Sequence, residues 1–219
     1  MSVHLQREIE NLKKAILSLS GKVEENLWRA VESLEEKDAD LASRVVDYDA
    51  EIDRGEVAVE EECLKILALH QPVAYDLRFI IAVLKINNDV ERVGDKAVSI
   101  ARRTLSLSRR PLPNLDFEFM PIADKARGML KKSLDALVKA DTALAREVRA
   151  EDEQVDALDH DICARIEAIM RQRPEDLDIL LLYRGVTGNL ERVADLATNI
   201  AEEVIYMVEG EIIRHKEER

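Results

Sequence analysis

Two acidic pairs recur one hundred positions apart in this chain. Residues 91–101 read ERVGDKAVSIA and residues 191–201 read ERVADLATNIA, and the two segments are identical at E, R, V, D, A, I and A. Each copy holds two carboxylates at four-residue spacing, namely Glu91 with Asp95 and Glu191 with Asp195. Four residues are just over one turn of an α-helix, so both carboxylates of a pair face the same way. Oxygen ligands presented in this way suit a hard cation.

A second, looser acidic repeat precedes each copy. Residues 47–53 read DYDAEID and residues 151–156 read EDEQVD. They contribute two further pairs at four-residue spacing, Asp49 with Asp53 and Asp152 with Asp156. If the helices of each half pack with these faces together, four carboxylates converge in each half. Such a set is the ligand environment that Mg²⁺, Ca²⁺, manganese or iron prefers.

The acidic pairs also have a purely structural interpretation. Asp and Glu make up 45 of the 219 residues, so chance alone supplies many acidic pairs at this spacing. Like charges at this spacing destabilise a helix by roughly 0.2–0.5 kcal/mol. A bound metal would offset that cost, and so would ion pairs from Arg92 and Arg192 to acids on an adjacent helix. His160, which shares a helix face with Asp156, is either a further ligand or a surface histidine. The spacing leaves these alternatives open.

Long amphipathic helices must position these residues. The chain is rich in Leu, Ala, Glu, Val and Arg and poor in Gly, Pro and aromatic residues, a composition typical of helical proteins. The apolar periodicity and the placement of the prolines predict six helices. They span about residues 3–36, 38–69, 73–107, 121–139, 141–172 and 174–215, with Asp38 and Asp141 as N-caps.

The predicted fold is therefore all-α, with two tandem pseudo-symmetric three-helix bundles. The proline-containing segment 109–114 separates a first repeat, residues 1–112, from a second, residues 113–219. The apolar runs 79–84 and 179–183 make the N-terminal ends of the third and sixth helices apolar on nearly every side, which predicts that these helices lie buried between the others. The repeated motif then lies on the central helix of each half.

Composition and motifs exclude several classes of function. The net charge of −13 disfavours a nucleic-acid partner and a bare anionic membrane. Neither a signal peptide nor an apolar run of membrane-spanning length is present. Cys63 and Cys163 are expected to be reduced thiols of a cytosolic protein. The sequence holds no Walker A loop, dinucleotide fingerprint, HExxH, nucleophile elbow or Glu-x-x-His motif, so we expect a protein that is not an enzyme.

At three segments the chain resembles the PhoU family of bacterial phosphate-regulation proteins. They are residues 71–78 (QPVAYDLR), 88–95 (NDVERVGD) and 189–202 (NLERVADLATNIAE). The resemblance implies a cytoplasmic negative regulator of the phosphate-starvation response. Its implied partners are the ATPase of the phosphate ABC transporter and the phosphate sensor histidine kinase, and it would be peripheral at the membrane through those partners only. Long amphipathic helices make a homodimer reasonable.

The resemblance also implies metal ions held by E/DxxxD motifs. Iron, zinc, manganese, magnesium and calcium are the candidates. The implied ligands are Asp49, Asp53, Glu91 and Asp95 in the first half, and Asp152, Asp156, Glu191 and Asp195 in the second. The family often has His directly after the motif aspartate, where this chain has Lys96 and Leu196. It has Asn four residues after that aspartate, kept as Asn199 but replaced by Ser99. We therefore expect the two sites to differ in strength.

Two other functions remain open from the sequence. A carboxylate-bridged metal enzyme, such as a phosphatase or an oxidase, could use the same acids to hold two ions and activate water. A purely structural helical adaptor would need no metal.

Overall fold

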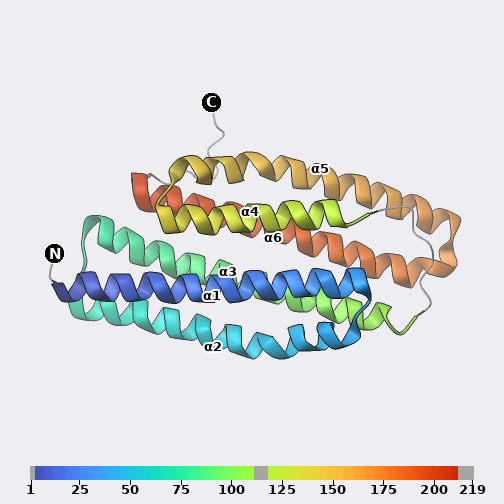
Figure 1. The fold of residues 1–219 in the computed structure, drawn as a ribbon. Helices are drawn as coiled ribbons and strands as arrows, with labels where there is room; N and C mark the ends of the chain where they lie inside the picture. Colours follow the sequence, from blue (N-terminus) through green and yellow to red (C-terminus); the bar gives the residue numbers. More distant parts are fainter. Residues whose placement is uncertain (1–2, 111–117, 212–219) are drawn as a thin grey trace.

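The protein consists of two three-helix units packed side by side (Figure 1). The computed structural model describes residues 3–110 and 118–211. In those ranges the helices are α1 (Val3–Glu36), α2 (Ala39–His70), α3 (Ala74–Leu107), α4 (Met120–Lys139), α5 (Thr142–Gln172) and α6 (Leu177–Glu209), with a short 3₁₀ turn, η1 (Pro174–Asp176), before α6. The predicted all-α fold of two tandem three-helix bundles is confirmed. The predicted repeat boundary, between residues 112 and 113, lies outside the described residues.

Aspartates begin the middle helix of each unit at equivalent positions. Asp38 and Asp141 have extended backbones, and each accepts a hydrogen bond from the backbone N–H three residues later, at 2.9 and 3.0 Å. This cap satisfies one of the amides left without a partner in the first helical turn. The residues just before the caps, Lys37 and Ala140, turn the chain with φ angles of 59° and 50°. Both predicted caps are confirmed.

The sixth helix differs from its prediction at both ends. Residues Pro174–Asp176 form the 3₁₀ turn, and the α-helix begins only at Leu177. The helix ends at Glu209, so the predicted end near residue 215 is wrong. The reason is Gly210, whose φ of 78° places it in the left-handed region and whose N–H bonds to the carbonyl of Tyr206. A glycine adopts this helix-ending conformation without a steric penalty.

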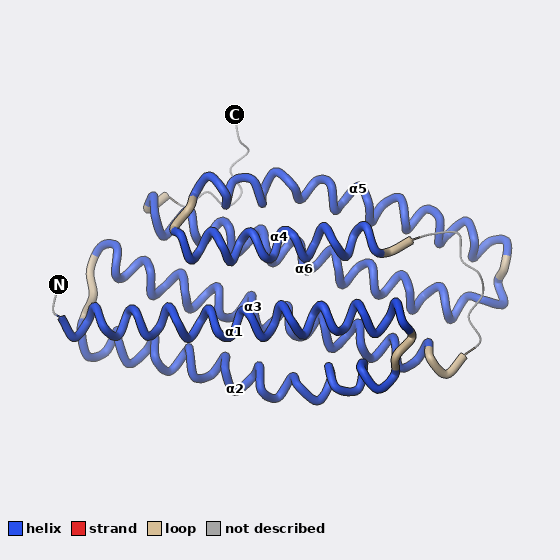
Figure 2. The backbone as a smooth tube through the Cα atoms, in the orientation of Figure 1, coloured by secondary structure: helices blue, strands red, loops and turns tan. Residues whose placement is uncertain are grey.

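The helices α3 and α6 form the centre of the molecule. Each contacts both other helices of its own unit, and the two contact each other along their lengths. Figure 2 shows that the loops lie at the ends of the bundle, so the long helices alone form its sides. Val83, Ile86 and Val186 are completely buried, which confirms the predicted central position of both helices. The N-terminal end of α6 is nevertheless not buried on every side, because Leu181 is 54% exposed.

The two central helices run antiparallel about a pseudo-twofold axis. Near one end Lys85 of α3 forms an ion pair with Glu203 of α6 at 3.2 Å. Near the other end the Arg103 side chain lies against Gly185, where an added methyl carbon would stand 2.8 Å from the guanidinium carbon. Since position i of α3 corresponds to position i + 100 of α6, these two contacts are equivalent. Their midpoints fall at residues 94 and 194, so the two copies of the repeated motif meet at the centre of the molecule.

Candidate functional site

The first acidic cluster joins α2 to α3. Burial raises the pKa of Asp49 above its ordinary value, and repulsion from Asp53 and Asp95 raises it further. Burial likewise raises the pKa of Glu91, with further repulsion from Asp95 first and then Asp53. The four carboxylates therefore lie near enough to repel one another. The structure brings together the four first-half residues that the sequence selected.

The second cluster joins α5 to α6 at the equivalent place. The pKa of Asp152 is raised by burial and then by repulsion from Asp195 and Asp156. The pKa of Glu191 is raised by burial and by Asp195, whereas the charge of Arg192 lowers it. All four second-half candidates are thus neighbours as well. Both clusters hold partly buried carboxylates in which the charged form is disfavoured, which is the electrostatic environment that a cation would relieve.

The sequence reasoning missed two further acids, Glu56 and Asp159. The charge of Glu56 contributes to the raised pKa of Glu91, and Asp159 contributes in the same way for Glu191. Each follows the second aspartate of its helix, Asp53 or Asp156, by three residues, so the acidic face continues for another turn. A search for acids at alternating three- and four-residue spacing would have found both. His160, the other ligand candidate, is exposed.

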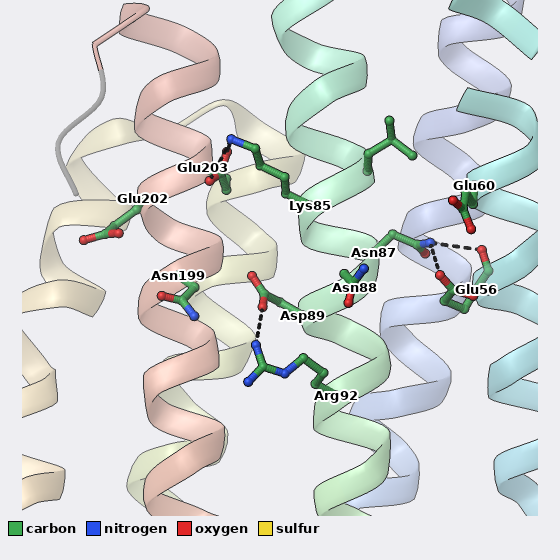
Figure 3. Close-up of a pocket in the computed structure, with 11 residues that line it drawn as sticks. Glu56, Glu60, Lys85, Asn87, Asn88, Asp89, Arg92, Asn199, Glu202 and Glu203 are labelled. Carbon is green, nitrogen blue, oxygen red and sulfur yellow. Dashed lines mark hydrogen bonds and ion pairs between the residues drawn. The ribbon is translucent and has the colours of Figure 1, made fainter. Parts of the chain in front are cut away.

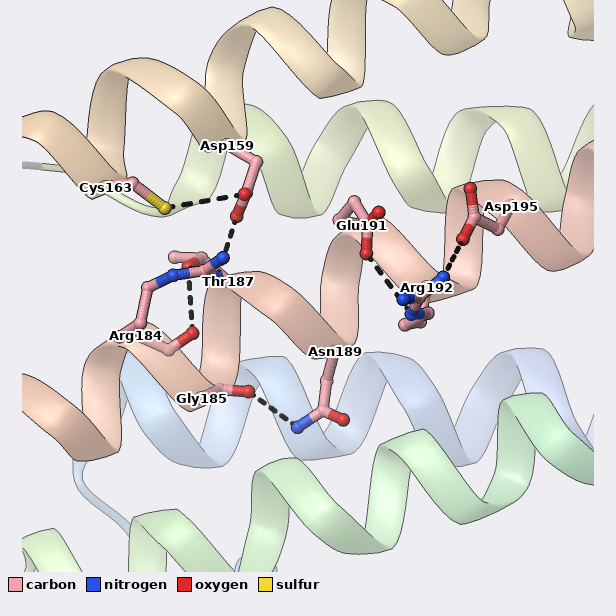
Figure 4. Close-up of polar contacts among 9 residues, drawn as sticks. All are labelled: Asp159, Cys163, Arg184, Gly185, Thr187, Asn189, Glu191, Arg192 and Asp195. Carbon is pink, nitrogen blue, oxygen red and sulfur yellow. Dashed lines mark hydrogen bonds and ion pairs between the residues drawn. The ribbon is translucent and has the colours of Figure 1, made fainter.

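The two motif arginines make different ion pairs (Figure 4 shows the second). Arg192 lies 2.7 Å from Asp195 and 3.6 Å from Glu191, so it binds both carboxylates of its own motif. Arg92 instead lies 3.4 Å from Asp89, which lies outside the repeated pair. The alternative that these arginines pair with acids on an adjacent helix is therefore wrong. Arg192 thus neutralises two acids of the second cluster, whereas in the first cluster Arg102 lowers the pKa of Asp49 only as the smallest contribution.

The candidate acids offer the oxygen ligands that a hard cation prefers, but their side chains are not arranged around an ion-sized site. Every candidate ligand is a carboxylate, and hard cations prefer oxygen ligands. Within residues 3–110 and 118–211, no group of three or more His, Cys, Asp or Glu side chains is arranged to hold an ion. Asp53 and Asp95 are exposed and can change rotamer, whereas Asp49 and Glu91 are partly buried. Binding would therefore require the exposed pair to reorient.

A polar network holds α5 to α6 next to the second cluster (Figure 4). Arg184 donates to Asp159 at 3.2 Å, and the thiol of Cys163 lies 3.5 Å from the same carboxylate. Burial raises the pKa of this thiol, and burial raises the pKa of Cys63 to about 12. Both cysteines are free, as expected, and both are held in the unreactive thiol form.

A groove of about 800 Å³ runs between α2, α3 and α6 (Figure 3). Lys85 and Glu203 lie at one end of it, and Asn87 donates to the Glu56 carboxylate at 3.2 Å at its α2 side. The remaining lining side chains are mostly polar or charged, namely Glu60, Leu84, Asn88, Asp89, Arg92, Asn199 and Glu202. The groove is thus a large polar surface shared by the two halves, and its character suits a protein partner better than an apolar ligand.

The duplication within this fold matches a known domain. The PhoU domain matches residues 16–104 and again residues 119–204. The chain belongs to the PhoU family. A phosphate-specific transport system accessory protein PhoU homolog from Pseudomonas putida is 36% identical over 216 residues, which cover 98% of this chain and 84% of that protein.

Solved PhoU structures share the whole fold. The crystal structure of PhoU from Pseudomonas aeruginosa superposes with a TM-score of 0.91 at 35% identity, covering 94% of this chain and 99% of the other. The phosphate transport system regulatory protein PhoU from Streptococcus pneumoniae gives a TM-score of 0.88 at 29% identity, covering 95% and 98%. In the part of this PhoU-family chain that the structure describes, no helix has the length and apolar character needed to span a membrane.

Proposed function

We propose that this PhoU-family protein is a negative regulator of the phosphate-starvation response and of phosphate transport, and that it acts by contacts with other proteins. The observation that supports this most directly is the pair of PhoU domains that together span most of the chain. Relatives carry the names of accessory and regulatory proteins of phosphate transport. The proposed partners are the ATPase of the phosphate transporter and the sensor histidine kinase. The protein would act in the cytoplasm as a homodimer.

A metal-dependent state forms the second part of the proposal. A cation bound by Asp49, Asp53, Glu91 and Asp95 would relieve the repulsion within the first cluster and fix α2 against α3. The equivalent acids of the second half would do the same for α5 and α6. Because Arg192 already neutralises two of those acids, the first cluster is expected to bind a cation more tightly. The all-oxygen ligand set favours magnesium, manganese, calcium or iron over zinc.

Partner capture tests the regulatory role. The full-length protein is immobilised and exposed to the purified transporter ATPase and, separately, to the cytoplasmic part of the sensor kinase. The proposal expects retention of both partners. It would be rejected if neither native partner were retained under any of several salt conditions. Repeating the capture with chelator present and then with added Mn²⁺ tests whether the contact depends on metal.

A matched pair of variants assigns any metal dependence to the clusters. Glu91→Gln with Asp95→Asn removes half of the first cluster, whereas Asp47→Asn with Glu153→Gln removes two exposed acids that lie outside both clusters. The first pair is expected to abolish the Mn²⁺ effect and the second to preserve it. Equal effects of the two pairs would show that only net charge matters.

Turnover assays separate this role from a carboxylate-bridged metal enzyme. Phosphatase and oxygen-consumption assays with iron, manganese and magnesium are expected to show no turnover above that of the free metal. Turnover that disappears on Glu191→Ala would instead establish the enzyme.

A further inference from the structure

A second pocket lies where the two repeated motifs meet at the centre of the α3–α6 pairing. Its volume is about 420 Å³. Both halves contribute its lining, which consists of Arg92 and Lys96 from α3, Asp152 from α5, and Arg192, Asp195, Leu196, Thr198 and Asn199 from α6. The pocket is therefore a product of the duplication, since neither half could form it alone.

Three cations gather around this pocket in a chain whose net charge is −13. Arg92 and Arg192 occupy equivalent positions of the two repeats, and the antiparallel pairing brings both to the same opening. Arg92 pairs with Asp89, whose side chain is only 14% exposed, and Arg192 pairs with Asp195, whose side chain is 35% exposed. Both arginine side chains are more than half exposed, so water screens both pairs. Within the described chain no hydrogen bond or ion pair engages the ammonium group of Lys96. The two guanidinium groups and this ammonium group can therefore turn toward an incoming anion.

The same pocket also contains acceptors. Asp152 and Asp195 line it together with the side-chain amide of Asn199. Carboxylates repel a fully ionised anion, but they accept a hydrogen bond from an anion that retains a proton. Inorganic phosphate retains at least one proton near neutral pH, whereas sulfate retains none. The combination of three cations with two carboxylates therefore favours phosphate over sulfate.

We infer that the pocket formed by Arg92, Lys96 and Arg192 with Asp152 and Asp195 binds one inorganic phosphate ion. The cations neutralise the phosphate oxygens, and an aspartate carboxylate accepts the hydrogen bond that the remaining P–OH donates. Two of its residues, Asp152 and Asp195, are also candidate cation ligands of the second cluster, so the inference concerns the metal-free protein, and it does not require the partner proteins of the proposed function. It gives the protein a direct contact with the ion whose transport its relatives are named for.

Isothermal titration of the full-length, chelator-treated protein tests the inference. Inorganic phosphate, sulfate and ATP are titrated separately at matched ionic strength. Binding of one phosphate per chain, with weaker binding of sulfate, is expected. Tighter binding of ATP than of phosphate would overturn the assignment, because it would identify the ligand as a nucleotide.

Two lysine variants complete the test. Lys96→Gln removes a charge-assisted contact and should weaken phosphate binding about tenfold. Lys131→Gln removes an exposed lysine of α4 outside this pocket and should leave the affinity unchanged. Equal affinity in wild type and Lys96→Gln, or no phosphate binding at millimolar concentration, would refute the site. Thermal unfolding of both variants without ligand verifies that each is folded.

Discussion

Glu203 on α6 has a side chain that is only 2% exposed, and its carboxylate lies 3.2 Å from the ammonium group of Lys85 on α3. The pair connects the two halves at the edge of the polar groove. The lysine side chain is 44% exposed, so the buried member of the pair is the acid alone. A buried carboxylate is costly to keep charged when its cation is removed.

Replacing Lys85 with Met should therefore destabilise the protein. Methionine retains an apolar stem of similar length but removes the charge, and with it the contact of the ammonium group with the Tyr206 ring, 5.3 Å from the ring centroid. We expect the free energy of unfolding to fall by about 1–3 kcal/mol in urea denaturation at neutral pH. Arg171→Met is the matched control, because its ion pair with Glu167 is strongly exposed and should contribute less than about 0.5 kcal/mol. Equal losses in the two variants would contradict a special role for the buried acid.

Neutralising the first cluster should stabilise the metal-free protein. The folded-state pKa values of Asp49 and Glu91 lie above their ordinary values of 3.8 and 4.5, so folding disfavours their charged forms. Stability therefore falls as the pH rises from those ordinary values through the raised folded-state values.

Asp49→Asn and Glu91→Gln should accordingly raise the free energy of unfolding at neutral pH in the presence of chelator. The gain should shrink as the pH falls toward the ordinary values of 3.8 and 4.5, because the wild-type carboxyls are progressively protonated. The exposed Asp47→Asn serves as control. Saturating Mn²⁺ should make the two variants less stable than the wild type, because only the wild-type acids can bind the cation in the folded state. A variant less stable than wild type at neutral pH without metal would disprove the repulsion.

Removing Arg192 should strengthen cation binding to the second cluster. Arg192→Gln frees Asp195 and Glu191 from their internal counter-ion, and loss of an exposed ion pair corresponds to an affinity gain of up to about fivefold. Mn²⁺ titration in a Glu91→Gln, Asp95→Asn background isolates the second cluster. Arg92→Gln in the same background should change the affinity little, and a larger effect there would reverse the assignment.

Replacing Ala140 with Gly should stabilise the turn before α5. Its φ of 50° costs a residue with a β-carbon about 1–2 kcal/mol, partly offset by the greater freedom of glycine in the unfolded chain. We expect a net gain of about 0.5–1 kcal/mol in thermal or chemical unfolding. Ala136→Gly, at a buried position within α4, should instead destabilise the protein. A lower melting temperature for Ala140→Gly would show that the turn is not strained.

Local rules explain what the sequence could predict. The Asp38 and Asp141 caps and the apolar periodicity depend on residues that are close in sequence. Helix starts and the two acidic pairs of each half could therefore be predicted. The rotamer of Arg192 depends on which acid lies closest in space, and spacing does not decide that. The central pocket depends on the antiparallel register of α3 and α6. That register is set by contacts between residues far apart in sequence, such as Lys85 and Glu203.

The contacts at the two ends of the α3–α6 pairing differ, since Lys85 meets Glu203 at one end and Arg103 meets Gly185 at the other. This difference also determines which helix surfaces can pack together. If α3 packed against α3 of a second copy in the same register, Lys85 would face Arg103 and Arg92 would face Lys96, each twice. Such a pairing places like charges together and is disfavoured. Pairing with α6 replaces the Lys85–Arg103 repulsions with the Lys85–Glu203 ion pair and with Gly185, which leaves room for Arg103. The sequence differences between α3 and α6 therefore favour packing of each half against the other half of the same chain, rather than against its own copy in a neighbouring molecule.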